Sequence, residues 1–194
     1  MIRIAVRATI AIVVLTVLTG LVYPAVMTGV AQIAFKDRAD GSLVEVGGTF
    51  VGSSLIGQQW KGDRWFHGRP SAIDDDASTS SGSNLGPNSK VLASAIEDRA
   101  AAIVKLEGPY NPGLTVAEIP IDLLAASASG LDPDVSEAAA LLQVPRIAAV
   151  RGLSESQVRA LVEGRVEGRL LGFLGQPRVN VLELNLALER MGHQ

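Results

Sequence analysis

A serine-rich stretch from Ser78 to Asn88 carries the side chains best suited to binding chemistry in this sequence. It leads into a predicted helix over residues 89–106, and successive backbone amides at a helix start can hold an anion such as phosphate. Its hydroxyl and carbonyl oxygens could equally meet a cation, and a capped turn would use the same residues. No Lys-Ser or Lys-Thr follows a glycine at the Walker spacing. The stretch therefore suggests a contact surface, with Ser83 and Asn84 as candidate residues.

Three adjacent aspartates, Asp74, Asp75 and Asp76, precede that stretch. Hard cations take oxygen ligands from several spaced positions, and neighbouring side chains cannot all point at one ion, so a solvated loop is favoured over a metal site. His67 and His193 are the only imidazoles, and the chain has no cysteine. This composition argues against a zinc site, a disulfide and a cysteine nucleophile. We predict no metal site and no catalytic residue.

Two further polar groups flank a predicted helix. Residues 127–132 place hydroxyls and a carboxyl before it, and Asp132-Pro133 is typical of a helix cap followed by a first-turn proline. A serine hydrolase would need a positioned base, and His67 is the only internal histidine. Gln143 and Arg146 lie near a helix end beside a proline. They could contact a partner protein, and we interpret them by default as a surface pair.

The element that must position all of these groups relative to a membrane is the start of the chain. Residues 8–35 contain no charged side chain, whereas Arg3 and Arg7 precede them. As a helix the run would be about 42 Å long, more than the roughly 30 Å of a bilayer's hydrocarbon core. We predict one transmembrane helix over 8–35, with a kink near Tyr23 because Pro24 lacks a backbone donor.

A cleaved signal peptide is the alternative for this segment, with a small-residue site at residues 29–31. The length of the apolar run favours a retained anchor. The two arginines in the tail, residues 1–7, place the N-terminus in the cytoplasm by the positive-inside rule. The domain is then predicted to lie outside, in the periplasm or its equivalent.

The remainder is predicted to be a linker, residues 36–48, followed by one extracytoplasmic α+β domain, residues 49–194. Beyond Phe35 there are 15 Lys or Arg and 20 Asp or Glu, a net charge of −5, which argues against nucleic acid as a partner. Within the domain we expect a short strand at 49–56, a second short extended piece that begins at Trp65 and is ended by Arg69-Pro70, and a long loop at 74–88. The run at 119–126 is strand or helix.

Helices are predicted from their apolar periodicity and their caps. After the helix at 89–106, Asp132-Pro133 opens a helix that carries the apolar residues 138–142, and Gly152 ends the next helical piece. Ser154 and Gln157 fit a capping box before a helix whose apolar stripe extends through Val166 and Leu170. Asn180 and Glu183 fit a last capping pair, for a helix to about Arg190.

In this order the motifs resemble those of the C subunit (KdpC family) of the Kdp-type potassium-transporting ATPase, over essentially the whole chain. The resemblance rests on the following segments: 20–24 (GLVYP), 52–58 (GSSLIGQ), 66–72 (FHGRPSA), 83–87 (SNLGP), 121–123 (IDL), 126–133 (ASASGLDP), 143–146 (QVPR), 149–151 (AVR) and 175–185 (GQPRVNVLELN). Two positions depart from the family pattern. Ser81 stands where the family's serine loop usually has glycine, and Leu142 stands where it has an aromatic residue.

The resemblance implies a complex in a bacterial inner membrane. Its other members would be a channel-like potassium-binding subunit, a P-type ATP-hydrolysing subunit and a small membrane peptide. The C subunit would be a non-catalytic assembly and accessory factor that binds no cofactor firmly. The family is also associated with raised ATP affinity of the ATPase subunit, with ATP held in the complex. A periplasmic domain cannot touch cytoplasmic ATP, so we give the topology more weight.

We therefore hypothesise a non-catalytic subunit of a high-affinity ATP-driven potassium importer whose domain covers the external ion entrance. The candidate contacts to a partner or to that entrance are Ser83, Asn84, Arg69, Ser129, Asp132, Gln143 and Arg146. The alternative is a solitary membrane-anchored or secreted solute-binding module.

Overall fold

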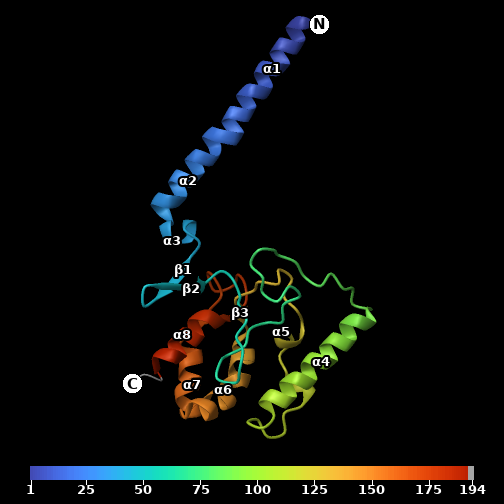
Figure 1. The fold of residues 1–194 in the computed structure, drawn as a ribbon, viewed down its shortest axis with the longest axis vertical. Coiled ribbons are helices and arrows are strands. Elements are labelled where there is room, and N and C mark those ends of the chain that lie inside the picture. The colour runs from blue at the N-terminus through green and yellow to red at the C-terminus, as the bar shows by residue number, and fades with distance from the viewer. Residues whose placement is uncertain (192–194) are drawn as a thin grey trace. The chain divides into compact units, whose positions relative to one another are not determined.

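A computed structural model describes residues 1–191 of the chain (Figure 1). Two compact units are distinguished, Met1–Ser53 and the chain from Ser54 onward. Each unit is built from helices and short strands, which confirms the predicted α+β class with one apolar N-terminal helix. His193 lies outside the described residues.

The first unit begins with a helix from Ile2 to Ala34 that is long and apolar enough to cross a membrane, and none of it is buried within the chain. It consists of α1 (Ile2–Val17), a π-helical turn η1 (Leu18–Val22) and α2 (Tyr23–Ala34). A kink was predicted near Tyr23, and the structure has the π turn directly before that residue. Pro24 has no N–H to donate, and a π turn is one way in which a helix accommodates such an interruption.

The predicted linker, residues 36–48, contains regular structure that the sequence reasoning missed. A short helix α3 (Lys36–Ala39) leads to β1 (Leu43–Val46), which pairs antiparallel with β2 (Thr49–Ser53). Gly47 and Gly48 join them with φ of 59° and 84°. Two residues with positive φ give the turn whose twist matches a hairpin, and glycine adopts this conformation without steric cost.

The second unit contains most of the helices. They are α4 (Lys90–Glu107), the 3₁₀ turn η2 (Val116–Glu118), α5 (Ile121–Leu124), α6 (Glu137–Arg151), α7 (Glu155–Glu163) and α8 (Val181–Met191). A small antiparallel sheet has the order β3-β5-β4, with β3 at Asp134–Val135, β5 at Arg178–Asn180 and β4 at Val166–Glu167. The ambiguous run at 119–126 is therefore helical where it is regular.

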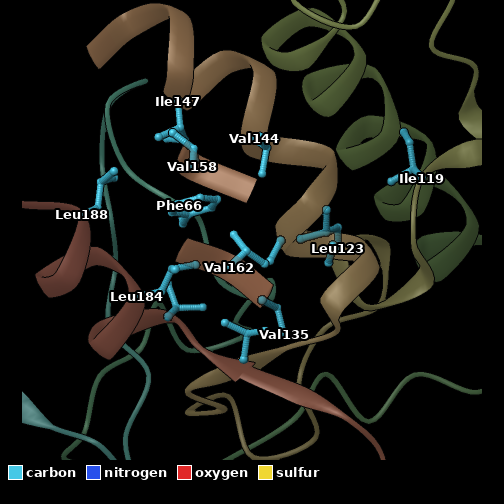
Figure 2. Close-up of a cluster of buried hydrophobic side chains, with 14 of the residues drawn as sticks. Phe66, Ile119, Leu123, Val135, Val144, Ile147, Val158, Val162, Leu184 and Leu188 are labelled. Carbon is cyan, nitrogen blue, oxygen red and sulfur yellow. The ribbon is translucent and has the colours of Figure 1, made fainter. Parts of the chain in front are cut away.

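The core lies where α6, α7 and α8 pack around Phe66 (Figure 2). Phe66 is fully buried although the segment predicted as an extended piece from 65 forms no regular strand. Its surroundings are aliphatic side chains with little or no exposed surface: Val135, Val144, Ile147, Val158, Val162, Leu184 and Leu188. This ring of branched residues explains why helices with few aromatic residues enclose one well-defined core.

Most predicted caps are confirmed. Ser154 and Gln157 form the capping box of α7, and the Asn180 side chain accepts the Glu183 N–H at 3.1 Å at the start of α8. The helix predicted over 89–106 is α4, and the structure adds a cap that was not predicted: the Ser89 side chain accepts the Leu92 N–H.

The predicted helix start at Asp132-Pro133 is wrong. Helix α6 begins after Ser136, whose Oγ accepts the Ala139 N–H at 3.1 Å, because Asp134 and Val135 pair with β5 instead. It then continues through Pro145, so the two predicted pieces are one helix.

The predicted stripe of α7 is also too long. The helix ends at Glu163, Val166 belongs to β4 and Leu170 is exposed. Gly164 follows the helix directly and takes a right-handed conformation as its C-cap. The apolar spacing of Val166 and Leu170 therefore continued by chance into a strand and a turn.

Candidate functional site

The predicted serine loop has no regular helix or strand, and only its first half is held against the domain. The Ser81 N–H donates to the Ser129 carbonyl at 2.9 Å, and the Ser80 hydroxyl donates to the same carbonyl at 3.1 Å. Gly82 lies so close to the backbone that an added Cβ would be 2.7 Å from the Ala128 carbonyl oxygen. Ser81 is not among the residues with positive φ, so serine is sterically acceptable where the family usually has glycine.

The two residues singled out in that loop, Ser83 and Asn84, are both exposed. Asn84 has a φ of 53°, a left-handed conformation that asparagine tolerates better than most residues. Their side chains are therefore available to another molecule, and their role as contacts stays a prediction.

A second group of hydroxyls ties the loop after Arg69 to residues 127–130. The Ser71 hydroxyl donates to the Gly130 carbonyl at 2.7 Å and accepts the Asp75 N–H at 2.9 Å. Gly130 has a φ of 71°, and a Cβ there would be 2.6 Å from the Ile73 side chain. Ser129 is exposed, and its Oγ accepts the Leu131 N–H at 3.1 Å. Both the main-chain carbonyl and the side chain of Ser129 therefore form hydrogen bonds that stabilise this turn.

Arg69 and Asp132, both candidates from the sequence, form an ion pair. Arg69 Nη1 donates to Asp132 Oδ2 at 2.9 Å, and the two side chains are 26% and 29% exposed. The other Asp132 oxygen accepts the Asp134 N–H at 3.1 Å. This use of the carboxylate replaces the helix-capping role that the sequence predicted. Arg69 Nε is buried and has no hydrogen-bond partner among the described residues.

The ion pair lies on the wall of a cleft of about 270 Å³. Its charged and aromatic lining consists of Trp60, Lys61, His67, Arg69, Asp74, Asp75 and Asp132. Burial raises the pKa of Asp75, and the neighbouring charge of Asp74 adds to the rise. Burial lowers the pKa of His67, whose Nε2 lies 2.7 Å from the Gly62 carbonyl and must carry the proton to donate there.

Two of the three adjacent aspartates face this cleft, and the third does not. Asp76 instead accepts the Ser78 N–H at 2.9 Å, and this hydrogen bond lowers the pKa of its carboxyl. Within residues 1–191 there is no group of three His, Cys, Asp or Glu placed to hold a metal ion. The cleft therefore offers both signs of charge, which suits a zwitterionic or polar contact better than a bare cation.

Arg146 is fully buried on α6, so the interpretation of Gln143 and Arg146 as a surface pair is wrong. Its Nε donates to Oε1 of Glu107 on α4 at 2.8 Å. Its Nη1 donates to the carbonyl of Trp65 at 3.0 Å and to that of Asp63, and Nη2 donates to Gln143 Oε1 at 3.0 Å. The guanidinium thus pairs with a buried carboxylate and satisfies two main-chain acceptors.

Two buried amides hold the next residues of the same segment. Gln143 accepts the His67 N–H at 2.8 Å and donates to the His67 carbonyl at 3.1 Å. Asn185 on α8 does the same for Phe66, with both distances 2.9 Å. These side chains pair with the main chain as a neighbouring strand would. We call Glu107, Gln143, Arg146 and Asn185 the polar clamp.

Sequence reasoning did not single out Glu107 or Asn185 as partners of Arg146 and Gln143. Glu107 is 2% exposed at the end of α4, and Asn185 is fully buried on α8. Their signal was a polar residue within an apolar helical stripe, which indicates a side chain with internal partners. The partners lie too far along the chain for spacing to identify them.

Comparison with known proteins places these observations in a family. Residues 5–190 match the family model described as "KdpC: K+-transporting ATPase, c chain". The chain is 50% identical to the potassium-transporting ATPase KdpC subunit of Rhodopseudomonas palustris (strain BisB5), with 94% of each chain covered. It is 49% identical to the KdpC subunit of Bradyrhizobium diazoefficiens, again over 94% of both chains, and 52% identical to that of Methylobacterium nodulans, over 91% and 92%.

Proposed function

The chain belongs to the KdpC family of K+-transporting ATPase c chains, and we propose that it acts as a non-catalytic accessory subunit of the potassium-transporting complex. Its partners would be the potassium-binding channel-like subunit, the ATP-hydrolysing P-type subunit and a small membrane peptide. In this role it stabilises the assembled complex and assists ATP hydrolysis by another subunit.

The observation that carries the proposal is the helix from Ile2 to Ala34, of which none is buried by the rest of the chain. Large apolar side chains are exposed along its whole length, from Ile4 at 73% to Ile33 at 89%. In water this surface would be strongly unfavourable, so lipid and neighbouring membrane helices are its natural surroundings. Even the Thr19 hydroxyl is satisfied internally, by the Leu15 carbonyl at 2.7 Å.

The proposed orientation places the N-terminus in the cytoplasm and the domain outside. Arg3 and Arg7 lie at the first turns of the helix, where cytoplasmic positive charge favours this orientation. ATP is then on the opposite side of the membrane from the cleft and the serine loop. Any influence of the outer domain on ATP affinity must therefore pass through the membrane, along this chain's own helix or the helices of its partners.

In the outer domain, the cleft with Arg69 and Asp132 and the exposed serine-loop residues Ser83 and Asn84 form the surface available for the ion entrance or its subunit. The polar clamp keeps the segment carrying Arg69 in place. The net charge of −5 beyond Phe35 favours cations near such a surface.

Extraction in mild detergent tests the accessory role. A tagged copy of the chain should co-purify with other membrane subunits, and the preparation should show potassium-stimulated ATP hydrolysis. The purified chain alone should release no phosphate from ATP. Steady hydrolysis by the isolated chain would refute the non-catalytic role, and purification without any partner would favour a solitary module.

Protease added to intact spheroplasts tests the orientation separately. The domain should be digested while the short N-terminal tail is spared. Protection of the domain in intact spheroplasts, with digestion after lysis, would overturn the proposed topology and leave the family assignment untouched.

A solitary solute-binding module is the second candidate, because the cleft of about 270 Å³ is polar and lined by convergent charged groups. Small-molecule sites typically enclose about 300–1,000 Å³, so this cleft is slightly below that range. Binding of a small solute by the isolated chain, with no partner subunits, would favour this reading.

A further inference from the structure

An exposed apolar turn lies between β4 and β5. Its large side chains are Leu170, Leu171, Phe173 and Leu174, which are 69%, 76%, 68% and 46% exposed. We call these four residues the apolar tip. Among the described residues from Ser54 onward, no other stretch of five exposes more than one large apolar side chain. Contiguous apolar surface of this kind marks an interaction site.

The backbone of the apolar tip is built as a closed turn. The Leu170 N–H donates to the Leu174 carbonyl and the Leu174 N–H donates to the Leu170 carbonyl, both at 2.9 Å. Gly172 donates to the Arg169 carbonyl at 3.1 Å, and Leu171 has a φ of 54°. Paired backbone groups lower the penalty for entering an apolar medium, where unsatisfied N–H and C=O groups are costly.

The charges beside the apolar tip differ from those of the rest of the domain. Residues 168–178 include Arg169 and Arg178 and no acidic residue, although the chain beyond Phe35 has a net charge of −5. Arg178 pairs with Asp134 at 2.9 Å and Glu167 at 2.6 Å, whereas no described residue forms an ion pair with Arg169. A free arginine next to leucines and a phenylalanine matches an anionic lipid headgroup above acyl chains.

We propose that the apolar tip inserts into the surface of the bilayer, with Arg169 at the level of anionic lipid headgroups. The same chain carries the helix Ile2–Ala34, so the proposed anchor tethers the domain to a bilayer. Between Leu170 and Gly175 there is no polar side chain that could form the hydrogen bonds of a protein–protein interface. Phenylalanine and leucine beside arginine are typical of segments that lie at the membrane interface.

The inference rests on the membrane anchoring within the proposed function, and one experiment separates the two. The natural chain has no cysteine, so a single introduced cysteine can be labelled with an environment-sensitive fluorophore. The full-length chain is reconstituted in nanodiscs of equal phosphatidylglycerol and phosphatidylcholine. Three labelled variants are compared: Phe173→Cys at the tip, Val14→Cys in α1 and Val91→Cys on α4, where an isolated valine is 65% exposed.

Spin-labelled lipids should quench the labels at positions 173 and 14 but not the label at 91. Iodide in the buffer should quench only the label at 91. Lipid quenching at 14 with free iodide access at 173 would overturn the inference and leave the anchor intact. Loss of lipid quenching at 14 would overturn the anchor itself. Protection from iodide at 173 without lipid quenching, seen only in the assembled complex, would refute lipid contact and assign the tip to a partner subunit.

A second set of variants tests the chemistry of the contact. With the label at position 174, Leu171→Ser should lower lipid quenching about twofold or more, because one apolar side chain fewer is buried. Val116→Ser, which changes an exposed valine elsewhere, should leave it unchanged. Arg169→Glu should reduce quenching more in the anionic bilayer than in pure phosphatidylcholine. Equal reduction in both bilayers would refute the headgroup contact.

Discussion

Replacing Arg146 by methionine is the most informative perturbation of the domain. The substitution keeps an unbranched apolar stem but removes every hydrogen bond of the guanidinium. Glu107, 2% exposed, would lose the only ion-pair partner that it has among residues 1–191, and the carbonyls of Asp63 and Trp65 would lose their buried donor. Breaking a buried ion pair from one side typically costs about 3–5 kcal/mol. That is a large part of the roughly 5–15 kcal/mol by which domains are stable.

The pH dependence of the lost stability shows whether the unpaired carboxylate of Glu107 is its cause. Burial raises the pKa of Glu107 above its ordinary 4.5, and the Arg146 charge and its hydrogen bond oppose the rise. Without Arg146 the pKa of Glu107 rises further, so the Glu107 carboxyl binds its proton more tightly in the folded variant than in the unfolded chain. Stability linked to that proton is fully present below the ordinary pKa and is lost as pH rises through the folded value. Arg146→Met should therefore be less destabilising at pH 5 than at pH 8.

The assay follows urea unfolding of the full chain in detergent by tryptophan fluorescence. Both tryptophans, Trp60 and Trp65, belong to the domain, and the carbonyl of Trp65 accepts a hydrogen bond from Arg146. Arg178→Met is the matched control, because its ion pairs are about half exposed at the arginine and should contribute at most about 1 kcal/mol. A loss below about 1 kcal/mol for Arg146→Met, or one that does not change with pH, would refute the reasoning about a buried carboxylate.

A double variant separates the cost of the unpaired Glu107 charge from the cost of the carbonyls that lose their donor. Glu107→Gln combined with Arg146→Met removes both charges, so it should be more stable than Arg146→Met alone. It should not regain full stability, because the partly buried carbonyl of Trp65 and that of Asp63 still lack their donor. The cost should lie below the ~1–3 kcal/mol of a fully buried unsatisfied group. A double variant that is less stable than Arg146→Met would show that Glu107 is stabilised by something other than the arginine.

Three smaller predictions concern single positions. Gly57→Ala should destabilise the domain by about 1–3 kcal/mol in urea unfolding, since a Cβ would lie 2.6 Å from the Asp132 carbonyl oxygen. Ser136→Ala should cost about 1 kcal/mol in the same assay, because it removes the N-cap of α6. Ser83→Ala with Asn84→Ala should change stability by no more than about 0.5 kcal/mol and reduce co-purification of the complex.

Matched substitutions accompany these three predictions. Gly68→Ala has no atom within 4 Å of the added Cβ and should be tolerated. Ser94→Ala changes an exposed serine within α4 and should be neutral or slightly stabilising. If the double alanine variant at 83 and 84 melts several degrees lower and its complex assembles normally, the serine loop is a structural cap rather than a contact.

The elements with local causes were predictable from the sequence. The long uncharged run predicted the apolar helix, apolar periodicity predicted α4, and the capping residues of α7 and α8 marked their starts correctly. Each of these signals depends on side chains within three or four positions of one another. The hairpin in the predicted linker was missed because β1 is only four residues long, too short for its alternation to stand out.

The helix start at Asp132 was mispredicted because the residues that follow it, Asp134 and Val135, pair with the distant strand β5, and Asp132 itself has a distant partner. Arg69 lies 63 positions earlier in the chain and pairs with Asp132. The same limit applies to Gln143 and Arg146. Their spacing on α6 indicated one helix face, but whether that face meets water or the core depends on Glu107 and on residues 63–67.

The polar clamp also explains how a segment without regular structure can position a binding group. Between Asp63 and Ser71 there is no helix and no strand. The clamp forms hydrogen bonds with the main chain of this segment at residues 63, 65, 66 and 67. At the far end, the Ser71 hydroxyl donates to the Gly130 carbonyl at 2.7 Å. Arg69 lies between these two fixed points, so its guanidinium is confined to the cleft wall beside Asp132. Loosening the clamp should therefore disturb the cleft even though no clamp residue touches Asp132.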